Sequence, residues 1–83
     1  MAGLIVTNVD TDVAGDVISL RLDCLFHSIG LKDLSVVSVD ILSTDSLATI
    51  KQKVVDALTA EATRLGYFVP ASNMILPAFQ KGA

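Results

Sequence analysis

The clearest pattern in the chain is an alternation of apolar and polar positions within residues 17–26, whose polar face ends at Leu25. The apolar positions are Ile18, Leu20, Leu22, Cys24 and Phe26, and the polar ones between them are Ser19, Arg21 and Asp23. A period of two is that of a β-strand with one buried face. The same alternation returns over residues 36–42, where Val37, Val39 and Ile41 face inward. We therefore expect strands at 17–26 and 36–42.

Three further segments surround these strands. Residues 4–9 are rich in β-branched side chains and predict another strand, although their alternation is imperfect. Residues 10–16 are rich in turn-forming residues and include Gly15, so we expect a loop that closes a hairpin. Residues 27–35 contain Gly30 and have no sustained period, which predicts a second loop. This loop is unusually apolar because of Ile29, Leu31 and Leu34.

A helical period follows over residues 46–65. Ser and Asp side chains at 43–46 can cap its start, and Gly66 stands where a left-handed residue closes a helix. The expected inward residues are Leu47, Ile50, Val54, Val55, Ala57, Leu58, Ala62 and Leu65. Lys51 and Glu61 interrupt this apolar face. Either both reach water at its margin, with Glu61 pairing to Arg64, or both meet charges from a second chain.

The last part of the chain is punctuated by Pro70 and Pro77, which leave room for a short strand at 74–76. Residues 77–83 have the character of a tail, in which Phe79 is a candidate for contact with a neighbour. We expect one domain over residues 1–83, of the α+β class. A small, mostly antiparallel sheet of three to four strands would carry one long helix on its apolar face, in the order β-β-β-α-β.

The composition adds a constraint on function. Of 83 residues, 52% are hydrophobic, and the mean hydropathy is +0.63. A domain of this size buries only about 60% of the surface that its unfolded chain exposes. The excess of apolar side chains therefore predicts that the chain associates with copies of itself or with other protein subunits of an assembly.

Charge and hydropathy argue against other classes of partner. The formal net charge is −3, and the basic residues are scattered, whereas nucleic-acid binding depends on grouped cations. A polybasic membrane patch is missing for the same reason. Charged residues interrupt every apolar run well before the roughly 20 residues that span a bilayer. Residues 1–6 lack the positive start of a signal peptide. We expect a soluble protein with no nucleic-acid or membrane partner. The sequence leaves its location open, with a virion and the cytoplasm as the two alternatives.

The side chains that could carry chemistry are few. One His and one Cys cannot supply the three or four ligands of a zinc site. The single Cys24 also excludes an internal disulfide, so it is either buried or bridged to another chain. It lies three residues from His27, which in a continuing strand places the two on opposite faces. We therefore expect no metal, no cofactor and no catalytic residue.

The acidic segment from Asp10 to Asp16 shares some positions with an EF-hand calcium loop. Its fifth position is Ala14, however, and its twelfth is Arg21, where a bidentate Glu belongs. The glycines form no phosphate-binding spacing either. A turn with solvated carboxylates is the better interpretation.

The resulting hypothesis is a non-enzymatic structural protein that self-associates or cements a larger assembly, such as the capsid or tail of a virion. In composition the chain resembles small accessory proteins of such assemblies. One alternative is a small adaptor or regulatory module that binds a partner through a sheet edge. Another is an enzyme or ligand binder whose site combines His27 and Glu61 from different chains. The candidate interface residues are Ile29, Leu31, Leu34, Lys51, Glu61, Met74 and Phe79.

Overall fold

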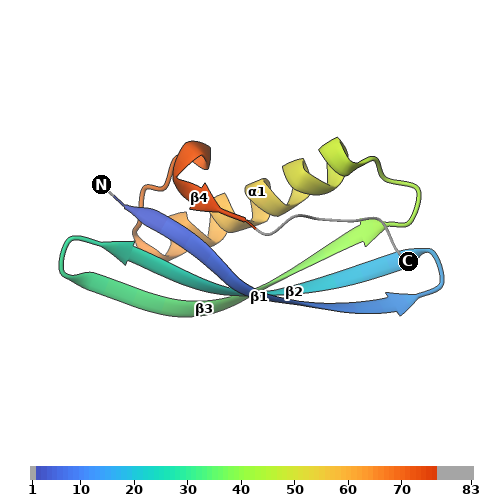
Figure 1. The fold of residues 1–83 in the computed structure, drawn as a ribbon, viewed down its shortest axis with the longest axis horizontal. Helices are drawn as coiled ribbons and strands as arrows, with labels where there is room; N and C mark the ends of the chain where they lie inside the picture. The colour runs from blue at the N-terminus through green and yellow to red at the C-terminus, as the bar shows by residue number, and fades with distance from the viewer. Residues whose placement is uncertain (1, 77–83) are drawn as a thin grey trace.

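The computed structural model describes residues 2–76, which form one four-stranded sheet and one long helix (Figure 1). The strands are β1 (Gly3–Ala14), β2 (Val17–Ser28), β3 (Leu31–Leu42) and β4 (Met74–Ile75), and the helix α1 spans Leu47–Leu65, with a short 3₁₀ turn at Ala71–Asn73. The sheet order is β3-β2-β1-β4. Neighbouring strands among β1, β2 and β3 are antiparallel, whereas β4 runs parallel to β1. The α+β class and the order β-β-β-α-β are therefore confirmed.

Both loop predictions are wrong in their extent. The segment 10–16 was expected to be a loop, but β1 continues to Ala14 and pairs with β2 along its length. The loop expected at 27–35 shrinks to Ile29 and Gly30, because β2 and β3 pair from Ser28 and Leu31 onwards. The physical reason is that pairing with β2 supplies backbone hydrogen bonds to residues whose side chains show no clear alternation.

Glycines close both hairpins. Each turn has two residues, and in each the glycine adopts a positive φ, 64° at Gly15 and 74° at Gly30. Short turns of this kind match the twist of paired strands only when a residue can adopt such a conformation. The hairpins are therefore tighter than the sequence pattern indicated, and the second one projects Ile29 at its tip.

The imperfect alternation of the first strand has a local cause. The register between β1 and β2 shifts between Val6 and Asn8, which makes Thr7 a β-bulge. The Thr7 hydroxyl donates a hydrogen bond to the carbonyl of Asp23 across the bulge, at 3.2 Å. Before the bulge the even-numbered residues face the core, and after it the odd-numbered Val9 does.

The helix begins and ends where the sequence predicts. The Ser46 hydroxyl accepts a hydrogen bond from the backbone N–H of Thr49 at 3.2 Å. At the other end Gly66 has φ 87°, and its N–H is directed to the last carbonyls of the helix. The buried helix residues lie four apart, at Ile50, Val54, Leu58 and Ala62. Leu47 was expected in the core, but it begins the first turn and is 53% exposed.

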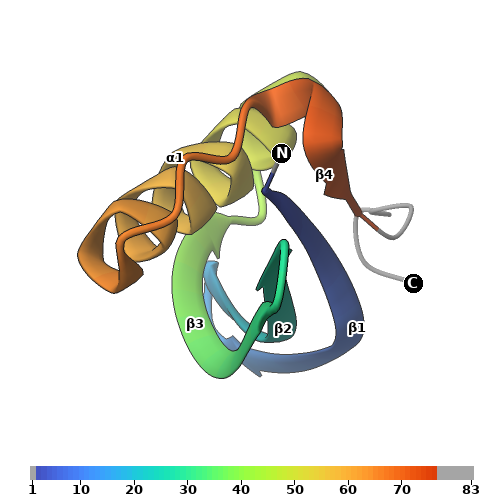
Figure 2. The same ribbon diagram turned by 90° about the vertical axis from the view of Figure 1, so that its left-hand side faces the viewer.

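The core lies between the helix and the concave face of the sheet. Figure 2 shows the sheet bent into a trough, with α1 above β3 and β4 at the opposite edge. The buried side chains include Leu4, Leu22, Phe26, Val39, Val54 and Leu58, and no polar or charged side chain of residues 2–76 is buried. This core leaves the convex face of the sheet and both hairpin ends open to solvent.

Candidate interaction surface

Many large apolar side chains stay outside this core. Within residues 2–76, those classed as exposed are Val13, Val17, Ile29, Leu31, Leu34, Val36, Leu42, Leu47, Phe68 and Ile75. Isolated exposed apolar residues are ordinary, but contiguous groups of them mark interaction sites. Two groups stand out: one at the end of the β2–β3 hairpin and one across the convex face of the sheet.

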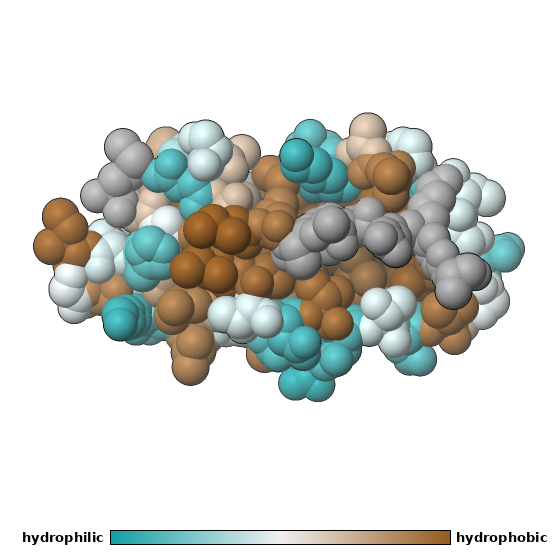
Figure 3. Space-filling model, viewed as in Figure 1, coloured by the Kyte–Doolittle hydropathy of each residue, from teal (hydrophilic) through white to brown (hydrophobic). Residues whose placement is uncertain are grey.

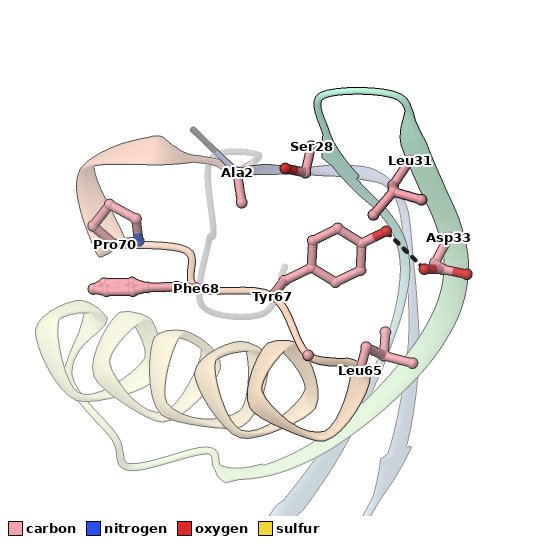
Figure 4. Close-up of a pocket in the computed structure, with 9 residues that line it drawn as sticks. Ala2, Ser28, Leu31, Asp33, Leu65, Tyr67, Phe68 and Pro70 are labelled. Atoms are coloured by element: carbon pink, nitrogen blue, oxygen red, sulfur yellow. Dashed lines mark hydrogen bonds between the residues drawn. The ribbon is translucent and has the colours of Figure 1, made fainter.

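The first group surrounds a cavity of about 490 Å³, which we call the hairpin groove (Figure 4). Its apolar walls come from Leu31 of β3, Leu65 at the end of α1, and the Tyr67–Pro70 segment that follows the helix. Asp33 is the charged residue among those lining it. The groove thus combines apolar walls with one carboxylate, at the end of the molecule that also carries Ile29.

Tyr67 holds one wall of the groove in place. Its backbone N–H donates to the carbonyl of Ala62 at 2.8 Å, which turns the chain back over the end of the helix. The ring is buried with its centroid 5.8 Å from that of Phe26. The hydroxyl donates to Asp33 Oδ2 at 2.7 Å, as Figure 4 shows, and this hydrogen bond is the main reason that the pKa of Tyr67 is raised.

Phe68 comes next and points the other way. In the extended segment after the helix, Tyr67 and Val69 are buried, whereas Phe68 is 74% exposed. In Figure 4 its ring lies beside Pro70 at the mouth of the groove. Leu31, which is 61% exposed, lies on the opposite wall. Two large apolar side chains therefore flank the groove while both remain in contact with water.

The second group is a row across the sheet, which we call the convex row. The strand registers place Ile75 beside Ile5, Ile5 opposite Leu25, and Leu25 opposite Leu34. The row thus crosses all four strands on the side away from the helix. Leu34 is 83% exposed and Ile75 is 62% exposed. Figure 3 shows one face of the molecule, where apolar surface gathers along the middle between hydrophilic patches.

The predicted candidate residues take different positions. Ile29 is 88% exposed at the hairpin tip, Leu31 lines the groove, and Leu34 belongs to the convex row. Lys51 is exposed on the helix. Met74 is buried and pairs with Leu4, so its side chain belongs to the core instead of an open surface. Phe79 lies outside the described residues.

Glu61 forms a local network, as one of the two interpretations of its position predicted. The guanidinium of Arg64 donates to both carboxylate oxygens, with Nε to Oε1 at 2.6 Å and Nη2 to Oε2 at 2.8 Å. The Ser35 hydroxyl of β3 donates to the same carboxylate. These donors lower the pKa of Glu61 from 4.5 to about 2. The network fastens the last turns of α1 to β3 close to the groove.

The structure separates the two side chains that nucleophilic catalysis would combine. Cys24 is buried on the core face of β2, and burial raises the pKa of its thiol to about 11, so the thiol is protonated at neutral pH. His27 lies three residues along the same strand and therefore on the other face. Its ring lies over Gly3, where an added Cβ would come within 2.5 Å of the imidazole.

No pattern in the sequence indicated that Phe68, Tyr67 and Asp33 are parts of one site. They come from two segments far apart in the chain, and only the turn after α1 brings them together.

In residues 2–76, no group of three or more His, Cys, Asp or Glu side chains is arranged to hold a metal ion. The described part of the chain also contains no helix of the length and apolarity needed to cross a membrane. Comparisons with protein families, with curated proteins and with solved structures find no match.

Proposed function

We propose that this protein is a non-enzymatic structural subunit that self-associates or cements a larger assembly, such as a virion capsid or tail. The observation that carries the proposal is the apolar surface at the end of the β2–β3 hairpin. There Leu31 and Phe68 line one groove and Ile29 lies in the adjoining turn, and each of the three is more than 60% exposed. Burial of apolar surface yields about 25 cal/mol per Å², so a partner that covers this region gains binding energy without further chemistry.

The composition of the groove supports this proposal. Interfaces are typically enriched at their centre in aromatic and large apolar residues, with polar groups around them. Here Phe68, Leu31 and Tyr67 supply aromatic and large apolar surface, and Asp33 and Ser28 supply polar groups among the lining residues. The Tyr67–Asp33 hydrogen bond holds two of the lining side chains in place, which reduces the side-chain entropy that these two lose on binding.

The test is the mass of the pure protein in solution. We expect sedimentation analysis between about 1 µM and 500 µM to show a discrete oligomer whose population rises with concentration. A Phe68→Ser variant should dissociate at higher concentration than the wild type, while Val13→Ser, an exposed apolar residue of β1, serves as the matched control. A protein that stays monomeric over the whole range, with no apolar dye binding, would contradict self-association.

One observation favours the adaptor alternative. β3 is an edge strand of twelve residues, and within the described part of the chain it has no second neighbouring strand. Such an edge can accept an extended peptide as an additional strand. The two proposals differ in a simple way: a structural subunit oligomerises alone, whereas an adaptor stays monomeric until its partner is added.

An enzyme site at a subunit interface, built from His27 and Glu61 of different chains, has less support. The Glu61 carboxylate already accepts hydrogen bonds from Arg64 and Ser35. Its lowered pKa makes it a weak general base at neutral pH, because an effective base has a pKa near the working pH. Unchanged oligomerisation and no loss of any activity in a His27→Ala variant would argue against this site.

A further inference from the structure

The hairpin groove combines exposed apolar walls with a carboxylate that is not in an ion pair within the described residues. Its walls are apolar, and its carboxylate, Asp33, receives a hydrogen bond from Tyr67. Among residues 2–76, the ion pairs are Lys53 with Asp45 and Arg64 with Glu61, so no cation of the described chain is paired with Asp33. The best-matched occupant therefore brings an apolar side chain together with a positive charge.

The tip of the β2–β3 hairpin offers this combination. Ile29 is 88% exposed in the two-residue turn, and the positive φ of Gly30 lets the turn project beyond the sheet. Lys32 follows three residues after Ile29, is exposed, and forms no ion pair within the described residues. The hairpin end thus carries an apolar tip and, on the face of β3 opposite to Leu31 and Asp33, a cation. These are the two groups that the groove of a second copy can accept.

The two features are also neighbours. Leu31 and Ser28, which flank the turn, line the groove of the same chain. Each copy therefore carries both a turn and a groove at the same end. When two copies meet about a two-fold axis, the turn of each can enter the groove of the other, and the dimer leaves neither feature unpaired. The groove's volume of about 490 Å³ lies within the range of sites that take up small ligands, and so has room for an isoleucine side chain.

We propose that two copies of this chain form a two-fold dimer in which each places Ile29 in the hairpin groove of the other, with Lys32 beside the partner's Asp33. This inference rests on the proposed self-association and names its partner and surface. In the dimer the Ile29 side chain leaves water and contacts Phe68 and Leu31 of the other groove. Each interface has two such contacts because the symmetry repeats them.

The first test changes the tip. Ile29→Asp puts a charge into the apolar groove. Loss of a hot-spot residue costs about 2 kcal/mol or more, so we expect the dissociation constant to rise at least about 30-fold. The matched control is Val13→Asp, because Val13 is 64% exposed on β1 near the other hairpin. Its dissociation constant should stay within about threefold of the wild type. Far-ultraviolet circular dichroism checks that both variants keep the fold.

The second test examines the charge pair. Lys32→Glu should weaken the dimer about 5- to 10-fold, and Asp33→Lys should weaken it as well. Combining the two restores opposite charges across the interface, so the double variant should bind more tightly than either single variant. Equal or weaker binding by the double variant would overturn the proposed contact.

A third test does not depend on how well Ile29→Asp folds. One copy carries Ile29→Cys and the other Phe68→Cys, and the two are mixed under mild oxidation. The native Cys24 is buried with a raised thiol pKa, so it does not compete. We expect a disulfide-linked heterodimer to form faster in the mixture than a homodimer does in either variant alone. No preference for the mixed species would overturn the proposal.

These experiments separate failure of the inference from failure of the proposed function. If the wild type oligomerises and Ile29→Asp leaves its dissociation constant unchanged, self-association stands, and another surface, such as the convex row or Leu47 with Lys51 on the helix, carries it. If the wild type is monomeric at every concentration, the proposed dimer fails together with the self-association on which it rests.

Discussion

The structure makes a sharp prediction about two leucines on one helix. Leu58 has no solvent-exposed surface and packs in the core, whereas Leu47, at the start of the same helix, is 53% exposed. Replacing each with alanine removes the same atoms and changes helix propensity by the same small amount. Any difference in stability therefore reports the difference in burial.

The expected magnitude follows from the packing. A buried Leu→Ala change loses the transfer free energy of the removed atoms and leaves a cavity, which together cost about 2–5 kcal/mol. Because Leu58 is fully buried in a wholly apolar core, we expect about 3 kcal/mol. Leu47→Ala should cost less than about 0.7 kcal/mol. A domain of this length has a total stability of about 4–12 kcal/mol, so only the first change threatens the fold.

The assay is urea unfolding followed by circular dichroism at one protein concentration, which keeps any contribution of self-association constant. The expected loss corresponds to a fall in Tm of about 12–24 °C for Leu58→Ala. The reasoning is refuted if the two variants lose similar stability, or if Leu58→Ala costs less than about 1 kcal/mol. Either result would mean that α1 does not pack on the sheet through Leu58.

Three further predictions concern single groups. The pKa of Glu61 is lowered to about 2, so its contribution to stability is complete above pH 4.5 and is lost as the pH falls from there towards 2. In a Glu61→Gln variant, the free energy of unfolding should therefore depend less on pH between 4.5 and 2. The buried Cys24 thiol, with its pKa raised to about 11, should react with an aromatic disulfide reagent at pH 8 at least 100-fold more slowly in the native protein than in denaturant, and equal rates would contradict its burial. Gly66→Ala should cost about 1–2 kcal/mol through its φ of 87°, since no atom obstructs the added Cβ, and Gly66→Asn should cost less; equal thermal stability of all three proteins would count against the helix cap.

Part of the candidate site was open to prediction. Ile29, Leu31 and Leu34 are exposed, as expected for apolar residues around a glycine that follow no regular strand or helix period. Without such a period, nothing in the local sequence directs these side chains into the core. Phe68 was missed because Tyr67, Phe68 and Val69 look alike in sequence, and only the position of the chain after Gly66 decides which of them faces out. Met74 was misplaced for the opposite reason, since its pairing with Leu4 across 70 positions buries it.

The sequence by itself determined the elements that have a strong internal period. The alternation of β2, the spacing of Ile50, Val54 and Leu58 in α1, and the caps at Ser46 and Gly66 all depend on neighbours in the chain. The tertiary structure alone decided where β1 ends, how short the β2–β3 turn is, and that Asp33 and Tyr67 meet. These features depend on hydrogen bonds and packing between segments distant in sequence, and a local pattern contains no information about such a partner.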